Sequence, residues 1–148
     1  MPKLAIVSDI EAVRLRVRSC LEGPDTEIRE APSGPEAICV FRDEEPDLAI
    51  LDMQVGSMGG IAICMEMRLV ESYGDLPHIP VLLLLDRRAD VFLAKRSGAE
   101  GWVVKPLDPA RLAAAAGALL IGQPYRDPSL MPHPIVNPVT LRPALEAG

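Results

Sequence analysis

Short apolar runs alternate with stretches of helical periodicity along the first 121 residues of the chain. A run of about four to eight apolar residues is typical of a strand, whereas apolar positions three and four residues apart are typical of a helix. The runs predict strands at residues 4–7, 26–30, 47–52, 79–85 and 101–104. The remaining stretches predict helices at about 11–21, 34–42, 60–72, 89–96 and 109–121.

This alternation predicts an α/β fold with a doubly wound, five-stranded parallel sheet. Parallel strands need long crossover connections, and the helices in those connections cover both faces of the sheet. The segment 47–52 is apolar between its two terminal aspartates, as expected of a central strand. The segment 26–30 is weaker and is typical of an edge strand.

Three helix boundaries carry sequence signals of their own. Ser33 is followed three residues later by Glu36, the spacing of a capping box. Gly98 predicts the end of the helix at 89–96. Asp108 followed by Pro109 predicts an N-cap with proline at the first helical position.

Composition and charge exclude several classes of protein. The chain has 148 residues, a net charge of −6 and a pI near 4.9, which argue for one domain and against a nucleic-acid-binding surface. The apolar runs are too short to span a bilayer and the N-terminus lacks a signal-peptide pattern, so we expect a soluble cytoplasmic protein. The three cysteines fall in different predicted helices and are expected to be small buried hydrophobes.

Residues 122–148 differ in composition from the rest of the chain. Six of these 27 residues are proline, and no periodicity remains. The chain therefore divides into a domain at 1–121 and a Pro-rich tail at 122–148. One interpretation is an extended arm that is ordered only where it packs on something. Another is a docking segment or a strap across the domain. A third makes the tail the functional part, with the domain as a platform for dimerisation or for docking on a larger complex.

Three charged residues stand at the ends of predicted strands. Asp9 follows the first strand, Asp52 ends the third, and Lys105 follows the fifth. If the strand order is 2-1-3-4-5, the ends of strands one and three border the crevice in which open α/β sheets bind ligands. Two neighbouring carboxylates repel each other unless a cation lies between them, so the pattern predicts a Mg²⁺ site with a lysine beside it.

The chain resembles the receiver domains of two-component response regulators over about residues 3–121. The resemblance rests on three segments that occur in order and at the expected spacing: PDLAILD at 46–52, GSMGG at 56–60 and SGAEGWVVKP at 97–106. It implies the flavodoxin-like (βα)5 receiver fold with strand order 2-1-3-4-5.

The resemblance also implies roles for individual residues. Asp52 would accept a phosphoryl group from a histidine kinase or a phosphotransfer protein. Asp9, Asp52 and the backbone carbonyl of Gln54 would hold Mg²⁺, and Lys105 would contact the phosphate. Beyond self-phosphorylation and self-dephosphorylation at Asp52, we expect no enzymatic activity.

Four positions depart from the family pattern, and a fifth, Trp102, matches a switch position. Ser8 replaces a second acidic residue, which should weaken Mg²⁺ binding. Leu85 replaces the switch Ser or Thr and cannot hydrogen-bond a phosphoryl oxygen. Asp86 replaces a small residue and would repel an incoming anion, at a cost of about 1–4 kcal/mol at ~4 Å. Gly56 replaces a loop proline, and Trp102 matches the aromatic switch position, where it either swings inward or is statically packed.

The leading hypothesis of function is a stand-alone, atypical response regulator that signals by protein–protein interaction. Its output would pass through the face of the fourth helix, fifth strand and fifth helix, controlled by Mg²⁺-dependent phosphorylation of Asp52. An equally weighted alternative is a phosphorylation-independent pseudo-receiver that docks a partner or forms a homodimer. A nucleotide or flavin binder is a remote alternative, because no glycine-rich loop follows the first strand.

Overall fold

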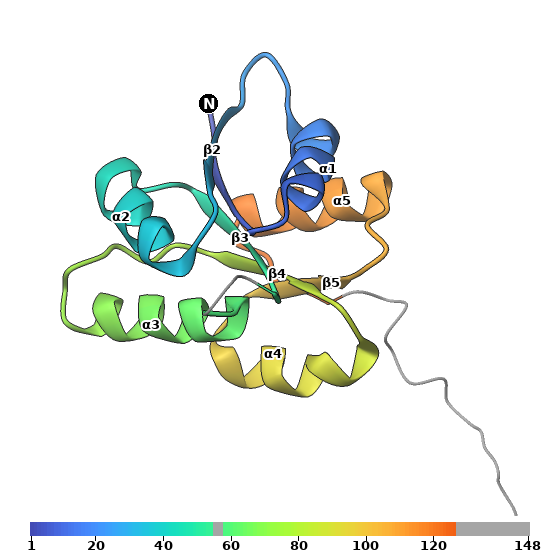
Figure 1. The fold of residues 1–148 in the computed structure, drawn as a ribbon. Coiled ribbons are helices and arrows are strands. Elements are labelled where there is room, and N and C mark those ends of the chain that lie inside the picture. Colours follow the sequence, from blue (N-terminus) through green and yellow to red (C-terminus); the bar gives the residue numbers. More distant parts are fainter. Residues whose placement is uncertain (55–57, 127–148) are drawn as a thin grey trace, which may run out of the picture.

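The computed structural model describes residues 1–54 and 58–126, and these residues form three layers (Figure 1). Gly56 and residues 127–148 of the tail lie outside the described residues. A parallel sheet forms the middle layer, with the strand order β2-β1-β3-β4-β5-β6. Helices α1 and α5 cover one face of the sheet, and α2, α3 and α4 cover the other.

The strands are β1 (Lys3–Val7), β2 (Glu27–Ala31), β3 (Leu48–Asp52), β4 (Val81–Leu85), β5 (Gly101–Val104) and β6 (Tyr125–Arg126). The helices are α1 (Glu11–Leu21), α2 (Gly34–Glu44), α3 (Gly60–Ser72), α4 (Val91–Ser97) and α5 (Pro109–Leu120), with a 3-10 turn, η1 (Arg88–Asp90), directly before α4. The predicted α/β fold and the order of its first five strands are confirmed.

Two features differ from the sequence-based expectation. The helix predicted at 89–96 is divided into η1 and α4, because Asp90 accepts a hydrogen bond from the backbone N–H of Arg87 and caps the 3-10 turn. The sheet also has a sixth strand, β6, which pairs in parallel with β5. The first residues of the Pro-rich tail therefore extend the domain beyond residue 121.

The predicted helix ends are confirmed by their contacts. The Ser33 hydroxyl accepts the backbone N–H of Glu36 at 3.3 Å and donates to the carboxylate of the same residue at 3.0 Å. The Asp108 carboxylate accepts the backbone N–H of Ala110 at 3.1 Å. Gly98 follows α4 with a φ of 88°, in the left-handed region where glycine is favoured.

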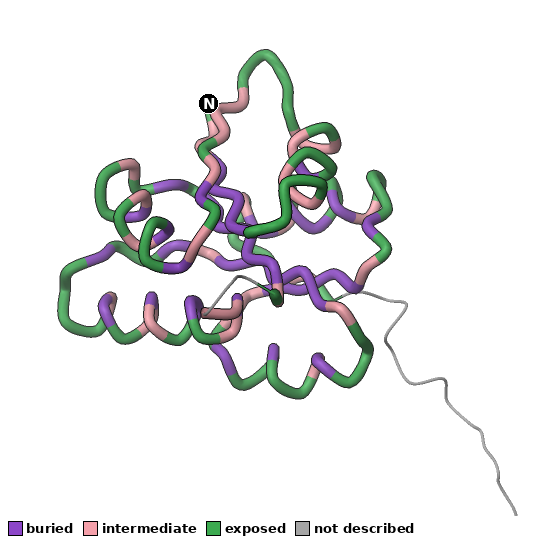
Figure 2. Tube along the Cα trace, viewed as in Figure 1, coloured by how far each residue is buried: buried purple, intermediate pink, exposed green. Residues whose placement is uncertain are grey.

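The central strands are the most buried part of the molecule (Figure 2). Apolar side chains pack into two clusters, one on each face of the sheet. Of the three cysteines, Cys64 is buried, Cys20 is intermediate and Cys39 is exposed, so the prediction of buried cysteines is wrong for Cys39. Among the described helices, none is long and apolar enough to cross a membrane.

Candidate functional site

The parallel register of β1, β3, β4 and β5 places the carboxyl ends of these strands side by side. Four polar residues stand at those ends: Ser8 after β1, Asp52 at the end of β3, Asp86 after β4 and Lys105 after β5. Hydrogen bonds join all four. We refer to these residues as the carboxylate cluster.

Asp52 is the centre of the carboxylate cluster and its side chain is fully buried. One carboxylate oxygen, Oδ1, accepts a hydrogen bond from the Lys105 ammonium at 2.6 Å and another from the backbone N–H of Gln54 at 3.4 Å. The other oxygen, Oδ2, accepts the Ser8 hydroxyl at 2.7 Å. A buried carboxylate is tolerated in a fold only when it is paired and hydrogen-bonded, and both oxygens of Asp52 meet that condition.

Lys105 is shared between two carboxylates. Its ammonium donates to Asp52 at 2.6 Å and to Asp86 at 2.8 Å, and its side chain is 21% exposed. Burial alone lowers the pKa of Lys105, but the two carboxylates outweigh burial and the pKa is raised above its ordinary value of 10.5. Two negative charges and one positive charge leave the cluster with a net charge of −1 when all three groups are ionised.

The end of β3 is also in close contact with the start of α3. A Cβ atom added to Gly60 would collide with the backbone oxygen of Asp52. The backbone N–H of Gly60 donates to the carbonyl of Met53 at 3.3 Å. Glycine at this position therefore lets the first turn of α3 pack directly against the strand end that carries the carboxylate.

The structure joins Asp52 and Lys105, two residues of the predicted site. The Asp52 carboxylate accepts hydrogen bonds from Lys105 and from the backbone N–H of Gln54, and Asp9 is exposed and directly follows Ser8 in the chain. Leu85 is fully buried and packs in the apolar cluster beneath α2, α3 and α4. An apolar side chain thus occupies the switch position, as the sequence indicates.

Asp86 is expected from the sequence to repel an incoming anion, but its partner is not evident from the sequence. Asp86 is paired with Lys105, which it shares with Asp52. The pair depends on strand register, because Leu85 and Val104 are register partners on β4 and β5 and are followed directly by Asp86 and Lys105. The residues that follow two paired strand ends are necessarily neighbours.

The donor set fits Mg²⁺ only as a weak site. Mg²⁺ prefers oxygen ligands, commonly one or two carboxylates together with waters. Asp9, Asp52 and the Gln54 carbonyl offer such oxygens, but among the described residues no group of three His, Cys, Asp or Glu side chains is arranged to hold a metal ion. A cation at Asp52 would also compete with Lys105 and Ser8 for the carboxylate oxygens.

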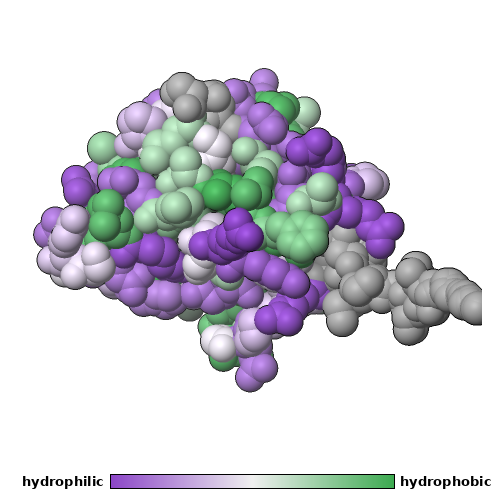
Figure 3. All heavy atoms as spheres, turned by 90° about the horizontal axis from the view of Figure 1, so that it is seen from below, coloured by the Kyte–Doolittle hydropathy of each residue, from purple (hydrophilic) through white to green (hydrophobic). Residues whose placement is uncertain are grey.

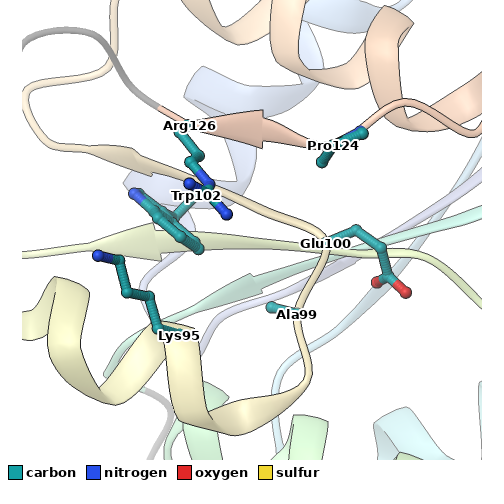
Figure 4. Close-up of a pocket in the computed structure, with 6 residues that line it drawn as sticks. All are labelled: Lys95, Ala99, Glu100, Trp102, Pro124 and Arg126. Carbon is teal, nitrogen blue, oxygen red and sulfur yellow. The ribbon is translucent and has the colours of Figure 1, made fainter. Parts of the chain in front are cut away.

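Two pockets lie away from the carboxylate cluster. One follows α3 and is mainly apolar, lined by Met58, Ala62, Met65, Glu66 and Leu69. Hydrophobic atoms are visible among polar ones on the underside of the molecule, where α3 and α4 lie (Figure 3). The other pocket, which has a volume of about 290 Å³, lies where α4, β5 and β6 meet, and Trp102 is one of its lining residues (Figure 4).

Comparison with known proteins identifies the family. The family model described as "Response regulator receiver domain" matches residues 4–117. Because the match covers most of the chain, the chain belongs to the response regulator receiver domain family of two-component signalling. The family resemblance and the fold expected from the sequence are both confirmed.

Similar proteins of known sequence include transcriptional regulators. AfsQ1 of Streptomyces coelicolor, a transcriptional regulatory protein, is 30% identical over 122 residues, which cover 81% of this chain and 52% of that protein. The probable transcriptional regulator ycf27 of Cyanophora paradoxa is 32% identical over 118 residues, covering 80% of this chain and 48% of that protein. The chain therefore spans about half the length of these curated relatives.

Solved structures show the same fold. A two-component response regulator of the LuxR family from Aurantimonas has a TM-score of 0.77 and 27% identity, with 88% of this chain and 92% of that chain covered. The chemotaxis protein CheY4 of Vibrio cholerae has a TM-score of 0.70 and 26% identity, with 80% and 98% covered.

Proposed function

We propose that this receiver domain signals by protein–protein interaction and that Asp52 is its phosphoacceptor. The observation that carries the proposal is the pairing of Asp52 with Lys105 at the carboxyl end of the central strand β3. A carboxylate there is a nucleophile for phosphoryl transfer, and an adjacent ammonium balances the charge that gathers on the phosphoryl oxygens. A histidine kinase or a phosphotransfer protein would donate the phosphoryl group.

Mg²⁺ would assist at the same site. The carboxylates of Asp9 and Asp52 and the carbonyl of Gln54 are the residues that would hold it, with water in the remaining positions. Ser8 supplies a hydroxyl in place of a further carboxylate, so we propose that the affinity for Mg²⁺ is low. Bound Mg²⁺ would neutralise charge on the phosphoryl group.

The carboxylate cluster sets a condition on this reaction. A phosphoryl group on Asp52 needs the Lys105 ammonium, and Asp86 already holds that ammonium at 2.8 Å. Asp86 must therefore release the Lys105 ammonium, or share it, before that ammonium can neutralise the negative charge of the phosphoryl oxygens. We propose that this competition makes phosphorylation slow and makes the domain an atypical receiver.

Output would pass through the face of α4, β5 and α5. Trp102 lies on β5 and is 5% exposed. A change in the packing around its side chain would therefore alter this face. Leu85 cannot hydrogen-bond a phosphoryl oxygen, which removes one route by which phosphorylation could reach Trp102.

A second candidate is a phosphorylation-independent receiver. The observation that favours it is that the buried carboxylate of Asp52 is fully satisfied by Ser8, Gln54 and Lys105 without any ligand. In this version the carboxylate cluster is a structural feature, and partner binding does not depend on phosphate.

Intact-mass spectrometry separates the two candidates. The protein is incubated with Mg²⁺ and phosphoramidate, and the unmodified chain is compared with Asp52→Asn. The phosphoacceptor version predicts the addition of one phosphoryl group to the unmodified chain and none to Asp52→Asn.

Asp47→Asn is the matched control, because Asp47 directly precedes β3 at its opposite end and accepts the backbone N–H of Lys3. This variant should be modified as readily as the unmodified chain. If the unmodified chain gains no phosphoryl group and does not bind beryllofluoride, the phosphoacceptor version is wrong and the phosphorylation-independent version stands.

A further inference from the structure

The pocket between α4, β5 and β6 combines one aromatic side chain with two basic ones. Trp102 comes from β5, Lys95 from α4 and Arg126 from β6 (Figure 4). Trp102 and Arg126 are register partners on neighbouring parallel strands, so their side chains lie on the same face of the sheet. We refer to Lys95, Trp102 and Arg126 as the edge pocket.

The positive charges of the edge pocket are available to a ligand. Lys95 and Arg126 are both exposed, and neither forms an ion pair with another residue in the described part of the chain. Glu100 also lines the pocket, but Figure 4 shows its carboxylate directed away from the indole. That carboxylate is held by Arg68 at 2.6 Å and by His78 at 2.7 Å.

The sixth strand is what completes this pocket. The backbone N–H of Tyr125 donates to the carbonyl of Glu100 at 3.2 Å, which fixes β6 against the edge of β5. Without β6 the pocket would lack Arg126 and Pro124. β6 pairs with Gly101 and Trp102 and so covers the edge of β5 beside the pocket, where side chains are what a ligand would contact.

We propose that the edge pocket binds an acidic peptide segment of a partner protein. Carboxylates of the peptide would pair with Lys95 and Arg126, and the indole of Trp102, which is 5% exposed, would form part of the pocket wall behind them. Charge complementarity supports this occupant: the chain as a whole carries a net charge of −6, yet this pocket presents two cations to solvent. The inference rests on the proposed function in one respect, that output passes through the face containing β5.

Fluorescence titration tests the proposal on the unphosphorylated full chain. Trp102 is the one tryptophan of the sequence and lines the edge pocket, so tryptophan emission comes from a residue at the proposed binding site. The probe is a short peptide of alternating Glu and Leu with blocked ends, compared with the same peptide carrying Gln in place of Glu. We expect a saturable change in emission with the Glu peptide, and a weaker affinity as salt is added.

Charge reversals locate the binding. Lys95→Glu and Arg126→Glu should each lower the affinity for the Glu peptide by roughly tenfold, because a favourable charge becomes a repulsive one. Arg42→Glu is the matched control, since Arg42 is exposed on α2 and is remote in the sheet order from β5. This variant should bind as the unmodified chain does, and circular dichroism confirms that all three variants are folded.

The proposal is overturned by any of three results: no change in emission with the Glu peptide, equal binding of the Gln peptide, or equal affinities of all three variants. Lys95→Glu keeps the test decisive even if Arg126→Glu displaces β6. The assay uses no phosphodonor, so its failure leaves the phosphorylation of Asp52 untouched. A failure of phosphorylation likewise leaves this binding test valid.

Discussion

The carboxylate cluster and the edge pocket each contain a lysine, but the two lysines differ in burial and in ion pairing. Lys105 is mostly buried and donates to two carboxylates, whereas Lys95 is exposed and has no ion-pair partner among the described residues. Burial makes an unpaired charge costly, and the charged groups of the cluster are accordingly paired with one another. The exposed charges of the edge pocket are under no such constraint and remain available to a partner.

The difference between the two sites indicates that a signal enters the domain at the carboxylate cluster and leaves it at the edge pocket. A ligand of the carboxylate cluster must displace an existing hydrogen bond, because both oxygens of Asp52 and the ammonium of Lys105 are engaged. A ligand of the edge pocket displaces no ion pair of Lys95 or Arg126 with a described residue. Slow modification at the first site and ready, reversible binding at the second are the expected behaviours.

The largest expected effect comes from removing the buried lysine. Lys105→Met leaves the fully buried Asp52 carboxylate without its cation, which should lower the free energy of unfolding by about 3 kcal/mol. The matched change Lys95→Met removes an exposed charge and should cost less than about 0.5 kcal/mol. Urea denaturation of both variants measures the difference, and equal losses would contradict the contrast drawn between the two lysines.

A smaller effect is expected at the junction of β5 and β6. A Cβ atom at Gly101 would lie 2.8 Å from the backbone oxygen of Tyr125 and 2.9 Å from Leu119 Cδ1, so Gly101→Ala must displace β6 or strain the core. We expect a loss of about 1–3 kcal/mol in stability together with weaker binding of the acidic peptide.

Gly117→Ala is the control for that substitution. Gly117 lies in α5 with no atom within 4 Å of an added Cβ, so alanine should stabilise the helix by up to about 1 kcal/mol. Thermal melts and the fluorescence titration report both effects. Unchanged peptide binding in a destabilised Gly101→Ala variant would show that β6 does not shape the edge pocket.

The pH dependence of stability should identify the Lys105 contacts. The pKa of Lys105 is raised above 10.5 in the folded state, so the folded state holds this proton more tightly than the unfolded state. The stabilisation is therefore fully present below about pH 10.5 and is lost as the pH rises through the folded-state value.

Urea denaturation of the unmodified chain and of Lys105→Met over this range measures that contribution. Their difference in unfolding free energy should stay constant from neutral pH to about pH 10 and shrink above it. A difference that already shrinks below neutral pH would show that Lys105 is not the titrating group.

The smallest expected effect concerns the cysteines. Burial raises the pKa of the Cys64 thiol, although Arg68 and the hydrogen-bonding contact with Ser97 oppose the rise. A thiol-reactive disulfide reagent should therefore modify the exposed Cys39 first and Cys64 last in the native protein. Peptide mapping after partial reaction gives the order, and all three should react alike in urea.

Much of the fold could be predicted because its signals are periodic. Strands β3 and β4 are continuous apolar runs, and the caps at Ser33 and Asp108 are local in sequence. The two-residue strand β6 has no period to detect, and its position depends on space left beside Gly101. Tertiary contacts of this kind leave no pattern in the sequence.

The candidate site could be predicted in part for a similar reason. Asp52 and Lys105 follow from strand ends that the sequence indicates, and the structure joins them. The role of Asp86 was missed, because a charge considered alone predicts repulsion while its pairing with Lys105 depends on strand register. The apolar environment of Leu85, in contrast, follows directly from the chemistry of its side chain.

The central claim is that Asp86 holds the Lys105 ammonium in competition with a phosphoryl group on Asp52. The most direct test is the rate of phosphoryl incorporation from phosphoramidate with Mg²⁺, measured by intact mass in the unmodified chain and in Asp86→Asn. Asp52→Asn is the negative control, since it lacks the phosphoacceptor. We expect Asp86→Asn to be modified roughly tenfold faster than the unmodified chain, because one competing charge is removed. An equal or slower rate in Asp86→Asn would contradict the claim.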